Sequence, residues 1–138
     1  MNQPTAQARA TQLLSTPVRA GAVIEIATGL ALVAAPSVVL DALIGSSSTD
    51  ASVVGRVLGG ALLALGIGGA LTDPRAPERG IRVAFLTYNA STAAMLARAG
   101  LAGSADGVLL WPAAALHALI AAGIASSPGD LREPVPCQ

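Results

Sequence analysis

Four polar side chains stand inside otherwise apolar stretches of this sequence: Glu25, Tyr88, Asn89 and His117. A carboxylate and an imidazole removed from water can exchange a proton near neutral pH, and a phenol and an amide can donate and accept hydrogen bonds beside them. If the four side chains meet, they form either a hydrogen-bonded cluster that fixes how helices pack, or a site that accepts a proton or binds a ligand. The sequence leaves both interpretations open.

The sequence has few residues or motifs that could support other kinds of chemistry. Cys137 is the only cysteine and His117 the only histidine, so we expect no disulfide within the chain, no metal site and no cofactor. The signatures HExxH, a nucleophile elbow and a Walker loop are absent. Eight arginines balance eight carboxylates without forming a basic patch, which argues against a nucleic-acid partner. We therefore expect a protein that is not an enzyme.

Four apolar segments contain or surround these residues. Charged residues make up only 12% of the chain and apolar residues 53%, which leaves too little polar surface to coat a water-soluble globule. The segments run over residues 18–40, 53–71, 81–99 and 107–126. Each is close to the ~20 residues that a helix needs to cross the hydrocarbon layer, and none alternates like a barrel strand. We therefore predict an all-α fold, an integral membrane four-helix bundle.

Polar segments flank the predicted transmembrane domain of residues 18–126. They are the N-terminal segment 1–17 and the Pro-rich tail 127–138, both expected in the cytoplasm. Pro36 interrupts the first apolar segment: either it kinks one helix, or that helix ends near it and Ser37 to Ile44 forms a short helix at the outer surface. Pro112 likewise marks either the first turns of the last helix or a kink.

The arginines fall unevenly about the four segments. Arg56 and Arg98 lie on one side. Six arginines lie on the other: Arg9, Arg19, Arg75, Arg79, Arg82 and Arg132. The positive-inside rule places these six in the cytoplasm together with both termini. We expect a multi-pass protein of the bacterial cytoplasmic (inner) membrane.

Depth in the bilayer follows from counting residues along each helix. With ~1.5 Å of rise per residue, Glu25 lies roughly 10 Å from the cytoplasmic end of its helix. Tyr88 and Asn89 lie at about the same depth, and His117 lies roughly 13 Å deep. Three helices thus present polar groups at one level, which predicts that these side chains face one another. Two threonines can join the layer: Thr28 and Thr92.

Two further groups of residues have a suggestive spacing. Gly55 and Gly59 form a GxxxG pair, which lets a neighbouring helix approach closely, either within the bundle or between two copies of the chain. A second group contains two acids and two bases near the outer surface: Asp41, Arg56, Arg98 and Asp106. These charges either pair with one another at the helix ends or bind a charged external ligand.

The run RVLGG at residues 56–60, followed by an apolar Ala/Leu/Gly helix, resembles small four-helix bacterial membrane proteins that are loosely DoxX-like. The pattern of Glu25, Gly29, Leu30 and Pro36 in the first segment is similar too. The resemblance covers most of the chain and implies the four-helix membrane architecture.

The function that we expect is that of a small accessory or self-associating subunit in a membrane complex. Its partners would be the lipid bilayer and either further copies of the chain or a larger membrane-protein complex. The alternative is a small transporter or binder of an apolar or protonatable molecule, which would use the Glu25 and His117 cluster.

Overall fold

The computed structural model describes residues 17–73 and 79–127, and all regular secondary structure in this part of the chain is α-helical. The helices are α2 (Pro17–Ala34), α3 (Pro36–Ile44), α4 (Thr49–Leu71), α5 (Arg79–Leu101) and α6 (Leu110–Ser126). The all-α prediction is confirmed, and each of the four apolar segments overlaps with one of the long helices. Apart from Pro17 and Ser127, the predicted flanking segments lie outside the described residues, as does Cys137.

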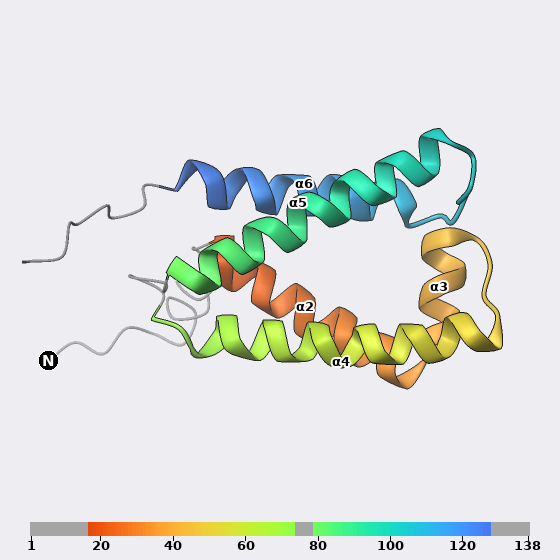
Figure 1. Ribbon diagram of the computed structural model, residues 1–138, viewed down its shortest axis with the longest axis horizontal. Coiled ribbons are helices and arrows are strands. Elements are labelled where there is room, and N and C mark those ends of the chain that lie inside the picture. Colours follow the sequence, from red (N-terminus) through yellow and green to blue (C-terminus); the bar gives the residue numbers. More distant parts are fainter. Residues whose placement is uncertain (1–16, 74–78, 128–138) are drawn as a thin grey trace, which may run out of the picture.

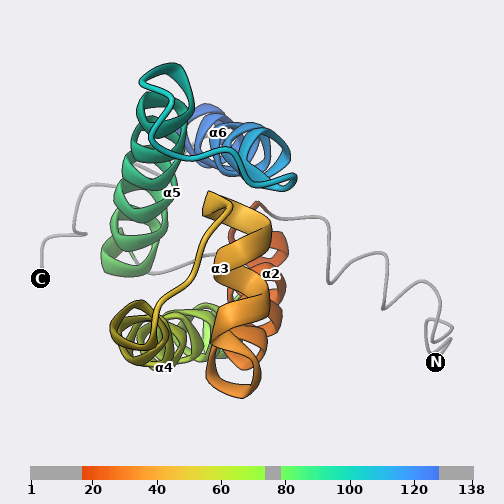
Figure 2. The same cartoon turned by 90° about the vertical axis from the view of Figure 1, so that its right-hand side faces the viewer.

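The four long helices run along the long axis of the molecule and alternate in direction (Figure 1). Seen end on, α2, α4, α5 and α6 stand at four corners, and α3 lies across one end (Figure 2). α2 packs mainly on α4, and α5 packs mainly on α6, whereas contacts between these two pairs are sparse. The architecture is therefore two closely packed helix pairs that meet through side chains.

The prediction of four helices needs a correction at Pro36. The described chain has five helices, because the first apolar segment is divided into α2 and α3 with Ala35 between them at φ −140° and ψ 63°. Proline has no N–H to donate, and it disfavours the helical conformation in the residue before it. Pro36 thus begins a short helix, which is the second of the two alternatives given for it. Pro112 lies in the first turn of α6.

Glycines bring the backbones of α2 and α4 into contact. A Cβ atom on Gly29 would lie 2.7 Å from the carbonyl oxygen of Gly59, and one on Gly59 would lie 2.8 Å from that of Gly29. A Cβ on Gly66 would lie 2.8 Å from the carbonyl oxygen of Ala22. Gly55 is buried on the same face of α4. Gly59 therefore lies in the α2–α4 backbone contact, where bare Cα atoms allow the close approach, whereas Gly55 lies against Pro36 and Leu40 of α3.

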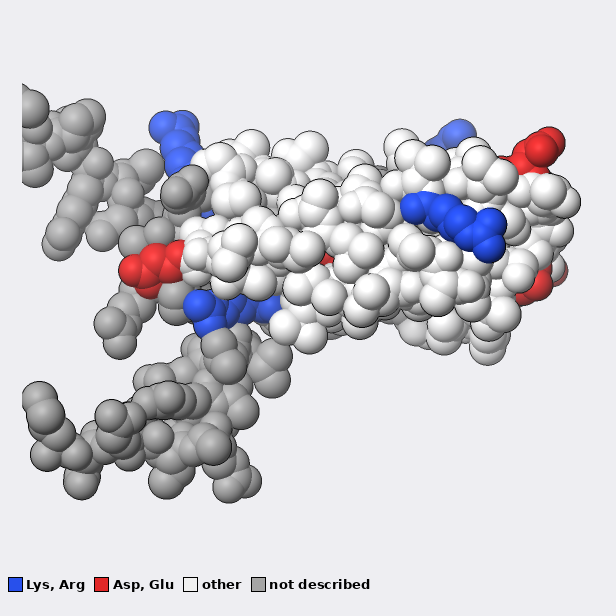
Figure 3. All heavy atoms as spheres, turned by 90° about the horizontal axis from the view of Figure 1, so that it is seen from below, with Lys and Arg blue, Asp and Glu red and all other residues white. Residues whose placement is uncertain are grey.

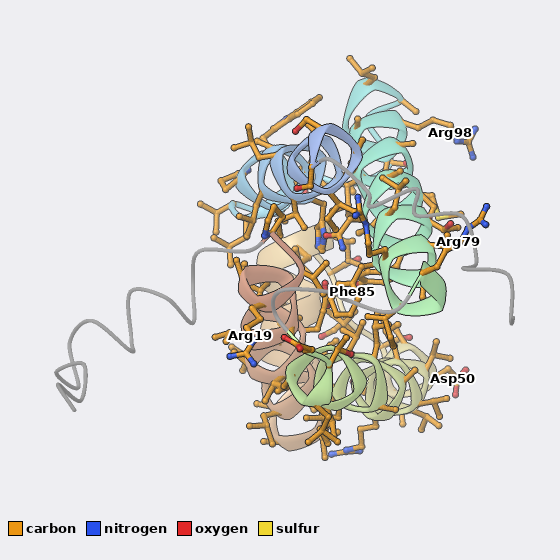
Figure 4. All side chains as sticks on the ribbon, turned by 90° about the vertical axis from the view of Figure 1, so that its left-hand side faces the viewer. Arg19, Asp50, Arg79, Phe85 and Arg98 are labelled. Atoms are coloured by element: carbon orange, nitrogen blue, oxygen red, sulfur yellow. The ribbon has the colours of Figure 1, made fainter. Side chains whose placement is uncertain are left out.

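Phe85 of α5 fills the space between the two helix pairs. Its side chain is 0% exposed, and Figure 4 shows it pointing into the interior while Arg19 and Arg79 point outward. Cβ atoms on Gly21 of α2 and Gly69 of α4 would lie 3.1 Å and 2.7 Å from its ring. The ring completes an apolar cluster with four other buried residues: Val18, Ala22, Ile120 and Ile124.

Hydrogen bonds join neighbouring segments at both ends of the bundle. Arg82, near the start of α5, donates from Nη2 to the carbonyl oxygens of Ile124 at 3.1 Å and Ser127 at 2.9 Å. Carbonyl groups at the end of a helix lack partners within it and carry partial negative charge, so Arg82 stabilises the end of α6. At the opposite end, the backbone N–H of Leu109 donates to the carbonyl oxygen of Ala42 at 2.8 Å, which ties α3 to the α5–α6 connection.

Candidate functional site

Glu25 occupies the middle of the buried face of α2. The buried residues of this face recur every three or four positions: Val18, Ala22, Glu25, Gly29 and Leu32. The Glu25 side chain is 0% exposed, and neither carboxylate oxygen has a hydrogen-bond partner among the described residues. The Tyr88 hydroxyl lies beside the carboxylate without reaching hydrogen-bond geometry. Helix packing alone therefore holds a buried carboxylate whose two acceptor atoms are unused.

Asn89 sets the orientation of His117. Asn89 is 0% exposed, and its Nδ2 donates to the carbonyl oxygen of Phe85 at 2.9 Å. A carbonyl oxygen can only accept, so the amide nitrogen faces it, and Oδ1 is left facing Nδ1 of His117 at 2.7 Å. Because Oδ1 is also an acceptor, Nδ1 must carry a proton. The neutral imidazole therefore has a bare lone pair at Nε2, which has no partner among the described residues.

Tyr88 connects the carboxylate to the imidazole. Its ring meets the His117 ring edge to face, with centroids 5.6 Å apart and planes at 83°. Its hydroxyl interacts with both Glu25 and Thr92. Thr28 makes no polar contact with these residues in the described chain. The four side chains singled out from the sequence thus form one connected set from three helices: Glu25 of α2, Tyr88 and Asn89 of α5, and His117 of α6.

This connected set is rich in acceptors and poor in donors. Glu25 offers two carboxylate oxygens and His117 offers Nε2, whereas the Tyr88 hydroxyl is the donor nearby. A carboxylate isolated in an apolar interior is costly, and a bound proton or hydrogen-bond donor lowers that cost. The described residues contain no group of three or more His, Cys, Asp or Glu that could hold a metal ion. The arrangement suits the capture of a proton or of a molecule that donates hydrogen bonds.

The four outer charged residues are not paired in this way. Within residues 17–73 and 79–127 no ion pair joins Asp41, Arg56, Arg98 and Asp106. All four are exposed, and Arg56 donates from Nε to the carbonyl oxygen of Val33 at 3.4 Å. Figure 4 shows Arg98 projecting away from the bundle. Their similar position along the chain segments therefore does not bring these charges into ion pairs within the described residues.

Two residues that position the site were not identified from the sequence. Phe85 provides the carbonyl group that orients Asn89, and Arg82 holds the end of the helix that carries His117. A signal for Phe85 was available, since Phe85, Asn89 and Thr92 recur at the spacing of one helix face. No signal in the sequence pairs Arg82 with α6, because that contact depends on how the helices assemble.

Comparisons of the chain with protein-family models, with curated proteins and with solved structures find no match. The resemblance to DoxX-like proteins stays a prediction.

Proposed function

We propose that this chain is a multi-pass protein of the bacterial inner membrane, with both termini in the cytoplasm, and that it binds a small molecule or a proton inside its helical bundle at Glu25. The observation that carries the binding role is the fully buried carboxylate that no described residue satisfies. Ionisable groups inside a membrane are costly, and they commonly mark binding or transport pathways.

Apolar outer faces support the membrane placement. α2 and α4 are long and apolar enough to cross a membrane, yet only 33% and 28% of their most apolar windows are buried. The core helix of a water-soluble protein would be mostly buried instead. Large apolar side chains also face outward on α5 and α6, including Met95 and Leu119, each 71% exposed. Lipid covers such a surface without the free-energy cost that water imposes.

The polar residues of α5 are compatible with the same placement. Asn89 faces the interior, and Ser91, although exposed, donates from its hydroxyl to the carbonyl oxygen of Tyr88 at 2.9 Å. A hydroxyl bonded to its own helix backbone leaves no unsatisfied donor in lipid. α6 is a shorter apolar helix of 17 residues without a formal charge.

Charged side chains gather toward the two ends of the described molecule and leave a largely uncharged belt between them (Figure 3). The uncharged part of α4 continues from Val57 to Leu71, and that of α5 runs from Val83 to Ala97. At 1.5 Å of rise per residue each of these stretches extends about 22 Å. Arginine side chains at their ends can extend toward the interface, which covers the rest of a hydrocarbon layer about 30 Å thick.

The contrast between Glu25 and Asn89 favours a binding role over a purely structural one. Polar side chains that fix helix packing pair with one another, as Asn89 does with His117 and with the Phe85 carbonyl group. Glu25 has no such pairing among the described residues. A carboxylate without partners stabilises no helix contact, whereas a site that captures a proton or a donor requires free acceptors.

An accessory or self-associating role, the leading expectation from the sequence, stays a prediction and is compatible with ligand binding. The size of the purified protein in mild detergent tests self-association. Co-purification of a larger membrane complex tests the accessory role.

Labelling with carbodiimides tests the proposal. Dicyclohexylcarbodiimide is apolar, enters lipid and adds to a carboxylic acid to give a stable N-acylurea. We expect the protein in lipid nanodiscs to gain this mass at Glu25 when treated in mildly acidic buffer, and the Glu25→Gln variant to gain none there. A water-soluble carbodiimide should instead modify carboxylates at the ends of the bundle, such as Asp106, which is exposed.

Two results would contradict the proposal. One is an unlabelled Glu25 in a folded protein, which would mean that small apolar molecules do not reach the carboxylate. The other is a purified chain that stays monodisperse in buffer without detergent, which would contradict the membrane placement.

A further inference from the structure

The Glu25 carboxylate has no counter-charge from the described chain. Arg82 is bonded to carbonyl groups at the end of α6, and Arg56 is bonded to the carbonyl group of Val33. Figure 4 shows Arg19, Arg79 and Arg98 pointing away from the interior. The site therefore lacks one positive charge, which a ligand can supply.

The hydroxyl end of an aromatic side chain lies next to the carboxylate. Tyr88 has its hydroxyl beside Glu25 and its ring against His117. The face of an aromatic ring attracts cations, most strongly where water is excluded. His117, against the same ring, belongs to the same polar layer. Acceptors and an aromatic ring together favour a cation that also donates hydrogen bonds.

The surroundings of Glu25 favour an organic cation over a metal ion. Metal ions need several ligands, and the described residues provide no group of three His, Cys, Asp or Glu for one. Along the helices, the buried neighbours are apolar: Ala22 and Leu32 on α2, and Leu62 on α4. Since the two helix pairs meet through side chains and few of their backbone segments approach closely, movement of side chains can admit a small molecule between them.

We infer that the ligand of this site is a small primary organic ammonium ion that carries an apolar group. Its N–H groups donate to the Glu25 carboxylate, its charge lies beside the Tyr88 ring, and its apolar group packs between the helix pairs. This inference rests on the proposed function and names the class of molecule that the site binds.

Protection from labelling tests the inference on the unmodified protein. Butylammonium is the probe, because an alkylamine stays protonated at neutral pH as a lysine side chain does. Butanol at the same concentration keeps the apolar group without the charge, and sodium chloride supplies a monocation without N–H groups. Because free butylamine can capture the activated carboxyl as a butylamide with release of dicyclohexylurea, the quantity measured is the total modification of Glu25, acylurea plus butylamide. At ten times its Kd, butylammonium should slow this total modification about ten-fold by mass action, while butanol and sodium should leave it unchanged.

The outcomes separate the inference from the proposed function. Labelling that proceeds unchanged with butylammonium overturns the ammonium ligand and leaves the proposed site intact. Equal protection by sodium or by butanol also overturns it, because charge alone or the apolar group alone would then suffice. Absence of labelling at Glu25 overturns the proposed function on which the inference rests.

Matched variants provide a second measurement. Calorimetric titration of butylammonium into nanodiscs should show a Kd that rises at least about ten-fold in Glu25→Gln, which corresponds to about 1.4 kcal/mol. Asp106→Asn removes a carboxylate at the end of the bundle and should leave the Kd unchanged. An unchanged Kd in a folded Glu25→Gln protein would overturn the inference.

Discussion

Replacing Gly59 by alanine should destabilise the bundle, whereas the same replacement at the adjacent Gly60 should not. A Cβ on Gly59 would lie 2.8 Å from the carbonyl oxygen of Gly29 and 2.9 Å from the Cβ of Leu32. A Cβ on Gly60 would meet no atom within 4 Å. The two variants therefore make the same chemical change one residue apart, at a buried and at an exposed position of α4.

The size of the difference follows from these distances. Ordinary van der Waals contact begins at 3.4 Å, so the Gly59 variant is short of room by 3.4 − 2.8 = 0.6 Å, and the obstacle is backbone. Overpacking of this kind costs about 1–3 kcal/mol. The gain in helix propensity from glycine to alanine, up to about 1 kcal/mol, is common to both variants. We therefore expect Gly59→Ala to be less stable than Gly60→Ala by about 1–3 kcal/mol.

Reversible unfolding by dodecyl sulfate in mixed micelles, followed by circular dichroism, measures this difference. The transition of Gly59→Ala should shift to a lower mole fraction of denaturing detergent, and that of Gly60→Ala should stay near the parent protein. Equal transitions for the two variants would refute the close contact between the backbones of α2 and α4.

Three other predictions concern residues around the polar site. Phe85→Ala should lower the free energy of unfolding by roughly 1–3 kcal/mol in the same assay. This is less than in a water-soluble core, because in the proposed membrane the separated helices stay in an apolar medium. An unchanged stability would argue against the place of Phe85 between the two helix pairs. Arg82→Gln should destabilise the protein by about 1–3 kcal/mol because the last carbonyl groups of α6 lose a charged donor, whereas Arg79→Gln serves as the neutral control. ¹⁵N NMR of the single histidine, with a histidine-free affinity tag, should show the neutral ring of His117 protonated at Nδ1 in the parent protein. The Asn89→Ala variant should show a mixture of the two tautomers. Protonation at Nε2 in the parent protein would contradict the orientation of Asn89.

The sequence was sufficient to predict the long helices, because apolar segments of about 20 residues have few alternatives in the proposed membrane. It left the interruption at Pro36 open, since proline is compatible both with a kink and with the first turn of a new helix. The structure shows what the sequence could not: a Cβ on Gly55 would lie 3.3 Å from Pro36, so the start of α3 packs against α4. That contact links residues far apart in the chain.

A sequence predicts the level of a residue along its helix better than the direction in which its side chain points. The constant rise of a helix placed Glu25, Tyr88, Asn89 and His117 at one level. Residue counting says nothing about the rotation of each helix, so it could not predict that Asn89 would pair with His117 while Glu25 stayed without a partner. The same limitation applies to the outer charges, which were expected at one level and form no ion pair with one another within the described residues.

The contact between Gly29 and Gly59 also restricts how this sequence can change over evolutionary time. In an ordinary core, a larger residue on one helix is accommodated by a smaller residue on its neighbour, and the two positions drift together. Here each Cα faces a carbonyl oxygen of the other helix, and no substitution can remove this backbone atom. Compensation is therefore unavailable, and descendants of this chain that keep the α2–α4 pair should retain glycine at both positions.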